Sequence, residues 1–159
     1  MKKTDTSNDI RIVPFKPEYA IHFNSLNKAW LEEYFTVEPI DRYVLENPEE
    51  AIINKNGKIL FAEQGGKIIG TVALKVMEPG RYELTKMAVD KELRGHGTGK
   101  ILCHAAIEEA RWLKAHTLIL YSSRKLENAI AIYRKMGFQE IPVEPGVYKR
   151  ADIKMQLIL

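Results

Sequence analysis

The sequence predicts one mixed α/β (α+β) domain built around a single sheet, and three observations lead to this fold class. The hydrophobic pattern alternates between strand and helix periods, in the order strand, helices, three strands, helix, strand, helix, two strands. The chain of 159 residues is 45% hydrophobic and 28% charged, which suits one globular domain with a sizeable core. Neither a repeat nor a linker divides the sequence.

The first third of the chain is expected to hold one strand and two helices. Residues 1–8 are polar and expected to be disordered, so the domain should span 9–159. Alternating isoleucines predict a first strand that ends at Pro14. Apolar residues at spacings of three and four predict a helix over 19–34. Pro39 fits the first turn of a second helix, which the following Asn-Pro pair would end.

The remaining two thirds should supply the rest of the sheet and two more helices. Two β-branched runs are divided by a Gly-Gly pair, which predicts a hairpin. The expected elements are strands over 58–64, 67–77 and 82–90, a glycine-rich loop, a helix over 100–114, a strand over 117–123, a helix over 127–136, and closing strands over 138–141 and 153–158.

The composition argues against several classes of protein. Lys and Arg total 24 against 21 Asp and Glu, a net charge of +3, and the basic residues are scattered as on a solvated surface rather than a nucleic-acid site. No apolar run approaches the roughly 20 residues of a membrane helix, and the N-terminal lysines do not introduce a signal peptide. A lone Cys103 excludes a disulfide framework, and the four histidines lack metal-ligand spacing. We expect a cytoplasmic protein without a nucleic-acid partner, a membrane partner or a metal.

Residues 94–100, RGHGTGK, are predicted to bind an anion. The glycines leave backbone N–H groups accessible, the following helix adds the positive end of its dipole, and Arg94 and Lys100 add charge. The spacing from Gly95 is one residue short of a Walker A loop, and Ile101 replaces its Ser or Thr. A dinucleotide fingerprint fails as well, because this loop follows an antiparallel meander. A phosphate or pyrophosphate is therefore the expected ligand.

Two further segments connect this loop with a known family. The loop contains the pattern R-x-x-G-x-G, which resembles the acyl-CoA pyrophosphate signature of the GNAT superfamily of N-acetyltransferases. The strand KMAVD before it and the segment NAIAIYRKMGF, residues 128–138, resemble the same family in the same order. The resemblance implies a GNAT-like, mostly antiparallel sheet flanked by helices and splayed between the strands 82–90 and 117–123. It also implies acetyl-CoA or CoA as cosubstrate, and direct attack of an amine on the thioester.

The resemblance also implies where the cosubstrate binds. In the family, the acyl-pantetheine arm lies between the splayed strands and pairs with strand backbone, and the pyrophosphate lies on the loop. Further contacts come from the helix that resembles the family, although ordinary solvation is the alternative for its basic residues. The implied cofactor-binding residues are Met87, Ala88, Val89, Arg94, Gly95, His96, Gly97, Thr98, Gly99, Lys100, Asn128, Tyr133 and Lys135.

Two side chains are candidates for proton transfer. Tyr133 stands at the tyrosine that faces the thioester sulfur in the family, where a phenol can donate to the departing thiolate; a packed aromatic is the alternative. Glu83 lies eleven positions before Arg94, an offset at which several family members carry a base. Strand alternation would place it on one face with Thr85 and Met87. For Glu83 the alternative is a surface carboxylate, with ordered water as the base.

The acceptor site is the least defined part of the resemblance. It would form from the first two helices and the connection between the last two strands. The first region is acidic and has aromatic neighbours, which would suit a cationic amine; its acidic residues are Glu32, Glu33, Glu38 and Asp41. The last connection carries Tyr148, Lys149 and Arg150, which could instead receive a carboxylate. A small amine, an amino acid and a protein lysine all stay open, as does a homodimer. The candidate substrate residues are Glu32, Tyr34, Phe35, Glu83 and Tyr148.

An N-acetyltransferase is therefore the predicted function. The alternative is a non-catalytic module that binds acyl-CoA and regulates another protein. The presence of both Tyr133 and Glu83 favours an enzyme, because a binding module has no need of either.

Overall fold

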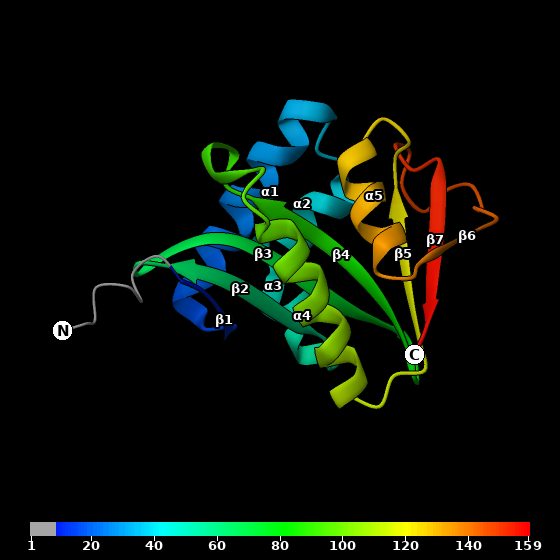
Figure 1. Cartoon of the computed structure of the whole chain (residues 1–159), viewed down its shortest axis with the longest axis horizontal. Helices are drawn as coiled ribbons and strands as arrows, with labels where there is room; N and C mark the ends of the chain where they lie inside the picture. The colour runs from blue at the N-terminus through cyan, green and yellow to red at the C-terminus, as the bar shows by residue number, and fades with distance from the viewer. Residues whose placement is uncertain (1–8) are drawn as a thin grey trace.

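Residues 9–159, which the computed structural model describes, form a mixed sheet with helices on both faces (Figure 1). The expected disorder of residues 1–8 lies outside the described residues. The strands are β1 (Ile10–Pro14), β2 (Lys58–Gln64), β3 (Lys67–Glu78), β4 (Arg81–Val89), β5 (Thr117–Ser122), β6 (Gln139–Ile141) and β7 (Ile153–Ile158).

These strands form one seven-stranded sheet in the order β1-β2-β3-β4-β5-β7-β6. The first four are an antiparallel meander, and β5, β7 and β6 are also antiparallel neighbours. Only the pair of β4 and β5 is parallel among the described strands. The predicted mostly antiparallel sheet and its element order are therefore confirmed.

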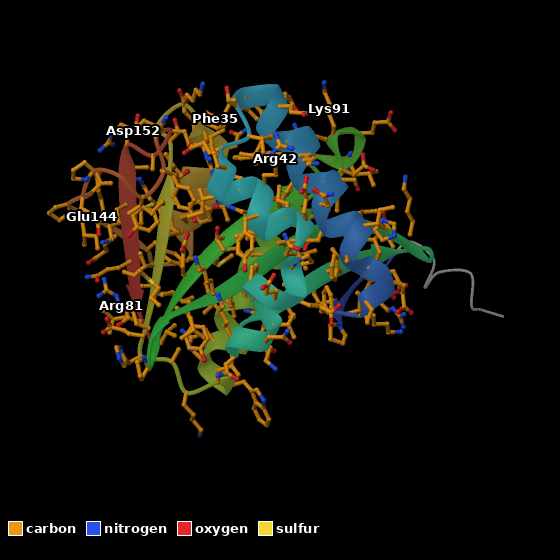
Figure 2. All side chains as sticks on the ribbon, turned by 180° about the vertical axis from the view of Figure 1, so that it is seen from behind. Phe35, Arg42, Arg81, Lys91, Glu144 and Asp152 are labelled. Carbon is orange, nitrogen blue, oxygen red and sulfur yellow. The ribbon has the colours of Figure 1, made fainter. Side chains whose placement is uncertain are left out.

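The helices divide between the two faces of the sheet. They are α1 (Ala20–Tyr34), α2 (Pro39–Glu46), α3 (Pro48–Ala51), α4 (Thr98–Trp112) and α5 (Glu127–Lys135). α4 and α5 lie in front of the sheet in Figure 1, whereas α1, α2 and α3 lie on the opposite face and come to the front in Figure 2. The short α3 was not predicted, because the Asn-Pro pair that ends α2 also starts a new helical turn at Pro48.

Each face of the sheet has its own apolar core. On one face, the small side chains of Ala106 and Ala110 are completely buried, so α4 lies close to the sheet. β3 carries Gly70 there because a Cβ at this position would come within 2.9 Å of Leu102 Cδ1. On the other face, α1 buries Phe23 as predicted, but it also buries Asn27, whose Nδ2 donates to Phe23 O over 3.0 Å. A polar residue at that position interrupts the apolar pattern, so the sequence did not reveal its burial.

The sheet opens between β4 and β5. Their parallel pairing covers residues 81–83 of β4 and 117–119 of β5, and then the two strands separate, which confirms the predicted splay. Beyond this point β4 keeps its partner β3 but contains a bulge, since Thr71 pairs with Ala88 and Ala73 with Thr85. Two residues of β4 therefore face one of β3. The bulge thus interrupts the pairing of β3 with β4, whereas the pairing of β4 with β5 ends before it.

The bulge corrects one prediction about side-chain direction. Strand alternation was expected to place Met87 on the same face of β4 as Glu83 and Thr85. Lys86 instead adopts a positive φ of 56° at the bulge, so the alternation reverses. Met87 packs against the same apolar cluster as Leu84, on the side of α4. Within residues 9–159, none of the helices has the length and apolar character needed to cross a membrane.

Candidate active site

A cavity of about 590 Å³ occupies the opening between the splayed strands. Its walls come from α1, β4, the start of α4, β5, α5 and the connection between β6 and β7. Most of the predicted cofactor residues line it, whereas His96 and Lys135 are not among its lining residues. The predicted residues that line the cavity are Met87, Ala88, Val89, Arg94, Gly95, Gly97, Thr98, Gly99, Lys100, Asn128 and Tyr133, together with Tyr34, Phe35 and Tyr148 of the expected acceptor site.

The glycine-rich loop has the geometry of an anion site. Gly95 and Gly97 have φ angles of 85° and 87°, a region that glycine adopts without strain. Gly97 is the N-cap of α4, so the free N–H groups of a 15-residue helix point from this end. The Oγ1 atom of Thr98 is buried and has no hydrogen-bond partner among the described residues. A donor without a partner next to a helix N-terminus fits a phosphate group.

Arg94 joins this loop to α1. Its Nη1 lies 2.8 Å from Glu33 Oε1, and its guanidinium stands over the ring of Tyr34 at 5.8 Å. Its Nε also donates to Val89 O over 3.3 Å. The ion pair with Arg94 lowers the pKa of Glu33, chiefly through the hydrogen bond. The loop and the C-terminal turn of α1 are therefore bridged at the rim of the cavity.

Lys125 makes a similar bridge from the other side, and sequence reasoning missed it. Its Nζ donates to Tyr34 O over 2.9 Å at the C-terminal end of α1, where a cation is favourable. The same Nζ lies 4.3 Å from the ring centroid of Phe35. The partners are separated by 91 residues in sequence, and an isolated lysine before a helix carries no signal that would identify such a contact.

Tyr133 presents a buried phenol to the cavity. Its ring packs edge-on against Phe138, with centroids 5.9 Å apart, and it is 8% exposed. Burial, and to a lesser extent the neighbouring Cys103, raises the pKa of Tyr133, so the hydroxyl stays protonated and available as a donor. Cys103 itself is fully buried outside the cavity lining, and burial raises the pKa of its thiol to about 12. Such a thiol is not prepared as a nucleophile.

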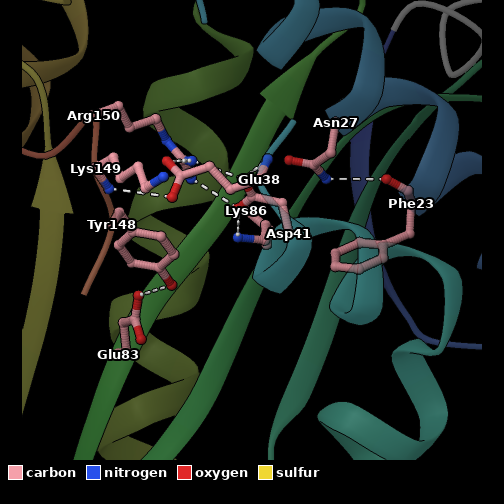
Figure 3. A network of polar contacts seen from close by, with 9 residues as sticks. All are labelled: Phe23, Asn27, Glu38, Asp41, Glu83, Lys86, Tyr148, Lys149 and Arg150. Carbon is pink, nitrogen blue, oxygen red and sulfur yellow. Dashed lines mark hydrogen bonds and ion pairs between the residues drawn. The ribbon is translucent and has the colours of Figure 1, made fainter. Parts of the chain in front are cut away.

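A buried ionic network lies between α2, β4 and the β6–β7 connection (Figure 3). Asp41 is completely buried and accepts hydrogen bonds from Lys86 Nζ over 2.9 Å and from Arg150 over 2.8 and 2.9 Å. Arg150 also donates to Glu38, the N-cap of α2, over 3.0 Å. Burial by itself would raise the pKa of Asp41, but the bonds from Arg150 and Lys86 outweigh it and lower this pKa. The network fixes the connection onto α2.

Glu83 and Tyr148 form a second buried pair beside this network. Tyr148 Oη donates to Glu83 Oε2 over 2.9 Å (Figure 3). Glu83 is 5% exposed and is not among the residues that line the cavity, whereas Tyr148 is. The sequence thus identified both residues but not their contact. Burial, followed by the charge of Glu83, raises the pKa of Tyr148.

The expected acidic rim is not what the cavity presents. Glu33 is paired with Arg94, and Glu38 and Asp41 are paired with Arg150. Glu32 is exposed and does not line the cavity. The described residues that line the cavity include five basic side chains and one acidic one, namely Lys86, Arg94, Lys100, Lys125, Arg150 and Glu127.

Comparison with known proteins identifies the family to which this arrangement belongs. The family model described as "Acetyltransferase (GNAT) family" matches residues 23–138. The chain belongs to the GNAT acetyltransferase family. The match includes β4, the glycine-rich loop, α4 and α5, and it confirms the resemblance seen in the sequence.

Individual relatives of this GNAT chain agree with that assignment. N-acetyltransferase family 8 member 2 of Rattus norvegicus is 33% identical over 96 residues, which are 57% of this chain and 42% of that protein. The chain thus spans less than half of the length of this curated relative. An acetyltransferase of the GNAT family from Staphylococcus aureus Mu50 superposes with a TM-score of 0.81 at 22% identity, covering 93% of this chain and 98% of that chain.

A second solved structure, PaiA N-acetyltransferase from Thermoplasma acidophilum in complex with coenzyme A, has a TM-score of 0.76 at 18% identity. It covers 95% of this chain and 99% of that chain. Both superpositions confirm that this GNAT chain has the fold of the family over most of its length.

The ionic network predicts a stability change for Asp41→Asn. Removing this charge leaves two cations in a buried site, so we expect the free energy of unfolding to fall by about 3–5 kcal/mol. The loss should be fully present above the ordinary aspartate pKa of about 3.9 and should disappear as pH falls through the lowered folded-state pKa. Urea denaturation of both proteins between pH 7 and pH 3 measures it. Glu50→Gln, at an exposed carboxylate on α3, is the control and should change stability by less than about 0.5 kcal/mol.

Proposed function

We propose that this chain transfers an acetyl group from acetyl-CoA to a primary amine by direct attack of the amine on the thioester. The observation that carries the proposal is that one cavity is lined both by the glycine-rich anion site and by the buried phenol of Tyr133. The PaiA relative has coenzyme A bound, which supports acetyl-CoA as the cosubstrate here. When bound, this cosubstrate supplies an activated acyl group.

Each part of the cavity has a role in the proposal. The N–H groups of residues 95–100, with Arg94 and Lys100, bind the pyrophosphate. The backbone of residues 87–89 pairs with the pantetheine arm, because β4 has left β5 and its edge is free for an extended amide chain. Asn128 adds a side-chain contact from α5, which lines the same cavity.

Tyr133 and Glu83 carry the proton chemistry in this proposal. The phenol of Tyr133 donates to the departing thiolate, and its protonated state supports that role. A carboxylate at Glu83 receives the proton that the amine must lose. The thiol of Cys103 is buried outside the cavity lining, which supports attack of the amine on the thioester without an acyl-cysteine intermediate.

The proposal includes three classes of acceptor amine. Aromatic side chains of α1, β5 and the β6–β7 connection line the cavity and favour an amine with an apolar part. A small amine, an amino acid and a protein lysine are the classes to be compared. We also propose, from the sequence, that the protein is cytoplasmic and acts either alone or as a homodimer.

A panel of amines tests the proposed function directly. We expect thiol release from acetyl-CoA, with a matching mass increase of one acetyl group on the amine, for at least one of phenethylamine, agmatine, free amino acids and lysine-containing peptides. Binding of acetyl-CoA without acetylation of any amine would instead support the non-catalytic binding module.

Binding of CoA should raise the melting temperature and should depend on Gly97. A ligand at a hundredfold excess over its Kd adds about 2.7 kcal/mol of apparent stability. We expect Gly97→Val to remove the thermal shift, because the left-handed φ of this residue places the loop N–H groups. Gly66→Val is a matched control: Gly66 also has a positive φ, 82°, and open space around it, but it lies in the β2–β3 hairpin. Both variants should lose stability, because valine is strained at a positive φ, but only Gly97→Val should lose the thermal shift with CoA. Loss of this shift in both variants would contradict the anion site.

Tyr133→Phe should separate binding from turnover. The variant keeps the packed ring, so acetyl-CoA should bind nearly as in the wild type. Loss of the donor should lower kcat by roughly 10²- to 10⁴-fold. Steady-state kinetics and a binding titration measure the two quantities. Tyr82→Phe, at a buried tyrosine of β4 that does not line the cavity, should keep kcat. An unchanged kcat in Tyr133→Phe would mean that the ring serves only packing.

A further inference from the structure

The connection between β6 and β7 carries a group that can take the proton of the acceptor amine. Glu83, which the sequence indicates as the base, is 5% exposed and does not line the cavity. Tyr148 lines the cavity and donates its hydroxyl hydrogen to Glu83 Oε2 over 2.9 Å (Figure 3). We propose that Tyr148 accepts the proton of the acceptor amine and relays it to Glu83. This relay rests on the proposed acetyl transfer.

The relay uses both properties of a phenol hydroxyl, whose oxygen accepts a hydrogen bond while its hydrogen is donated. One N–H bond of the ammonium breaks as Tyr148 Oη takes the proton, and the hydrogen already on Oη moves to Glu83 Oε2. The ammonium becomes a neutral amine, the carboxylate becomes a carboxylic acid, and Tyr148 is a neutral phenol before and after. The lone pair of the amine is then free to attack the thioester carbon.

The surroundings of Tyr148 suit this passage of a proton. Lys86 Nζ lies 5.1 Å and Arg150 Cζ lies 4.8 Å from the centroid of its ring, so two cations face the phenol. Their charge stabilises the negative charge that develops on Oη during the transfer. The ring of Tyr121 packs edge-on from β5 at 5.8 Å. Burial and the charge of Glu83 raise the pKa of Tyr148, so the resting phenol keeps its hydrogen and donates it to Glu83.

The same cations hold Tyr148 in place. Lys86 and Arg150 both bind the buried Asp41, one from the bulge of β4 and the other from the β6–β7 connection. The connection is also anchored at its end, where Asp152 Oδ1 accepts a hydrogen bond from the Arg124 N–H over 2.8 Å. A substitution of Asp152 loosens this anchor but keeps the side chains of Tyr148 and Glu83. It therefore separates the effect of moving the connection from the effect of removing a proton carrier.

The test compares Tyr148→Phe, Glu83→Gln, the double variant and the anchor control Asp152→Ala. Each protein is assayed across pH with the panel amine that the wild type acetylates fastest, and with the β,β-difluoro analogue of that amine, which is less basic. The relay predicts that both single variants lose roughly 10²- to 10⁴-fold in kcat/KM for the basic amine, with the rising limb of the pH profile moved to higher pH. The analogue, of which a larger fraction is neutral at a given pH, should lose much less.

The double variant should be no slower than the slower single variant, because both residues act in one path. Asp152→Ala should change KM while retaining the wild-type pH profile and the ratio between the two amines. Three results would overturn the relay but not the proposed acetyl transfer. They are equal losses of kcat/KM on both amines, an unchanged rising limb of the pH profile in Tyr148→Phe, and additive losses in the double variant. A wild-type protein that acetylates none of the panel amines would overturn the proposed function, and the relay with it.

Discussion

The early end of the pairing between β4 and β5 is the constraint on which the rest of the site depends. Buried backbone N–H and C=O groups need partners, and a strand that leaves its neighbour presents them without one. β4 does so after Glu83, while β3 continues to satisfy its other edge. The opening is therefore lined by backbone that an extended, amide-containing ligand can satisfy. The anion site at the start of α4 and the phenol of Tyr133 lie along the same opening.

The end of α1 closes this opening through contacts between distant parts of the chain. Arg94 from the glycine-rich loop and Lys125 from the β5–α5 connection both reach the last turn of α1. A partly exposed ion pair, such as Arg94 with Glu33, adds little to stability, and the Lys125 contact is a single exposed hydrogen bond to a backbone carbonyl. Their consequence is positional, because they fix where the aromatic residues Tyr34 and Phe35 lie relative to both walls of the cavity.

Local patterns in the sequence predicted the elements of the fold, but not the contacts within the site. The hairpin, the glycine-rich loop and the stripe of α4 depend on turn chemistry and on spacing within a few residues, so they were predicted correctly. The bulge at Lys86 gives no such signal, since lysine has no preference for a positive φ, and the direction predicted for Met87 was therefore wrong.

The charged residues of the site show the same limit of prediction from local sequence patterns. In the sequence, Glu38 and Asp41 stand in an acidic run, which indicated a site for a cationic amine. The fold pairs them with Arg150, which is more than a hundred residues away, and Asp41 also with Lys86. Local charge patterns cannot reveal such neutralisation, because it depends on which distant segment packs against the run.

Stability alone does not explain why Asp41, Lys86 and Arg150 are buried together. Well-packed apolar side chains of similar volume often match or exceed the stability of a buried ionic group, because the cost of desolvating the charges is avoided. Apolar packing, however, is non-directional, whereas the two bonds from Arg150 to one carboxylate fix distance and angle. The β6–β7 connection has no regular structure from Pro142 to Asp152 that would fix it otherwise. Directional bonds thus position Tyr148 against β4, and a proton can pass only where such a short contact is maintained.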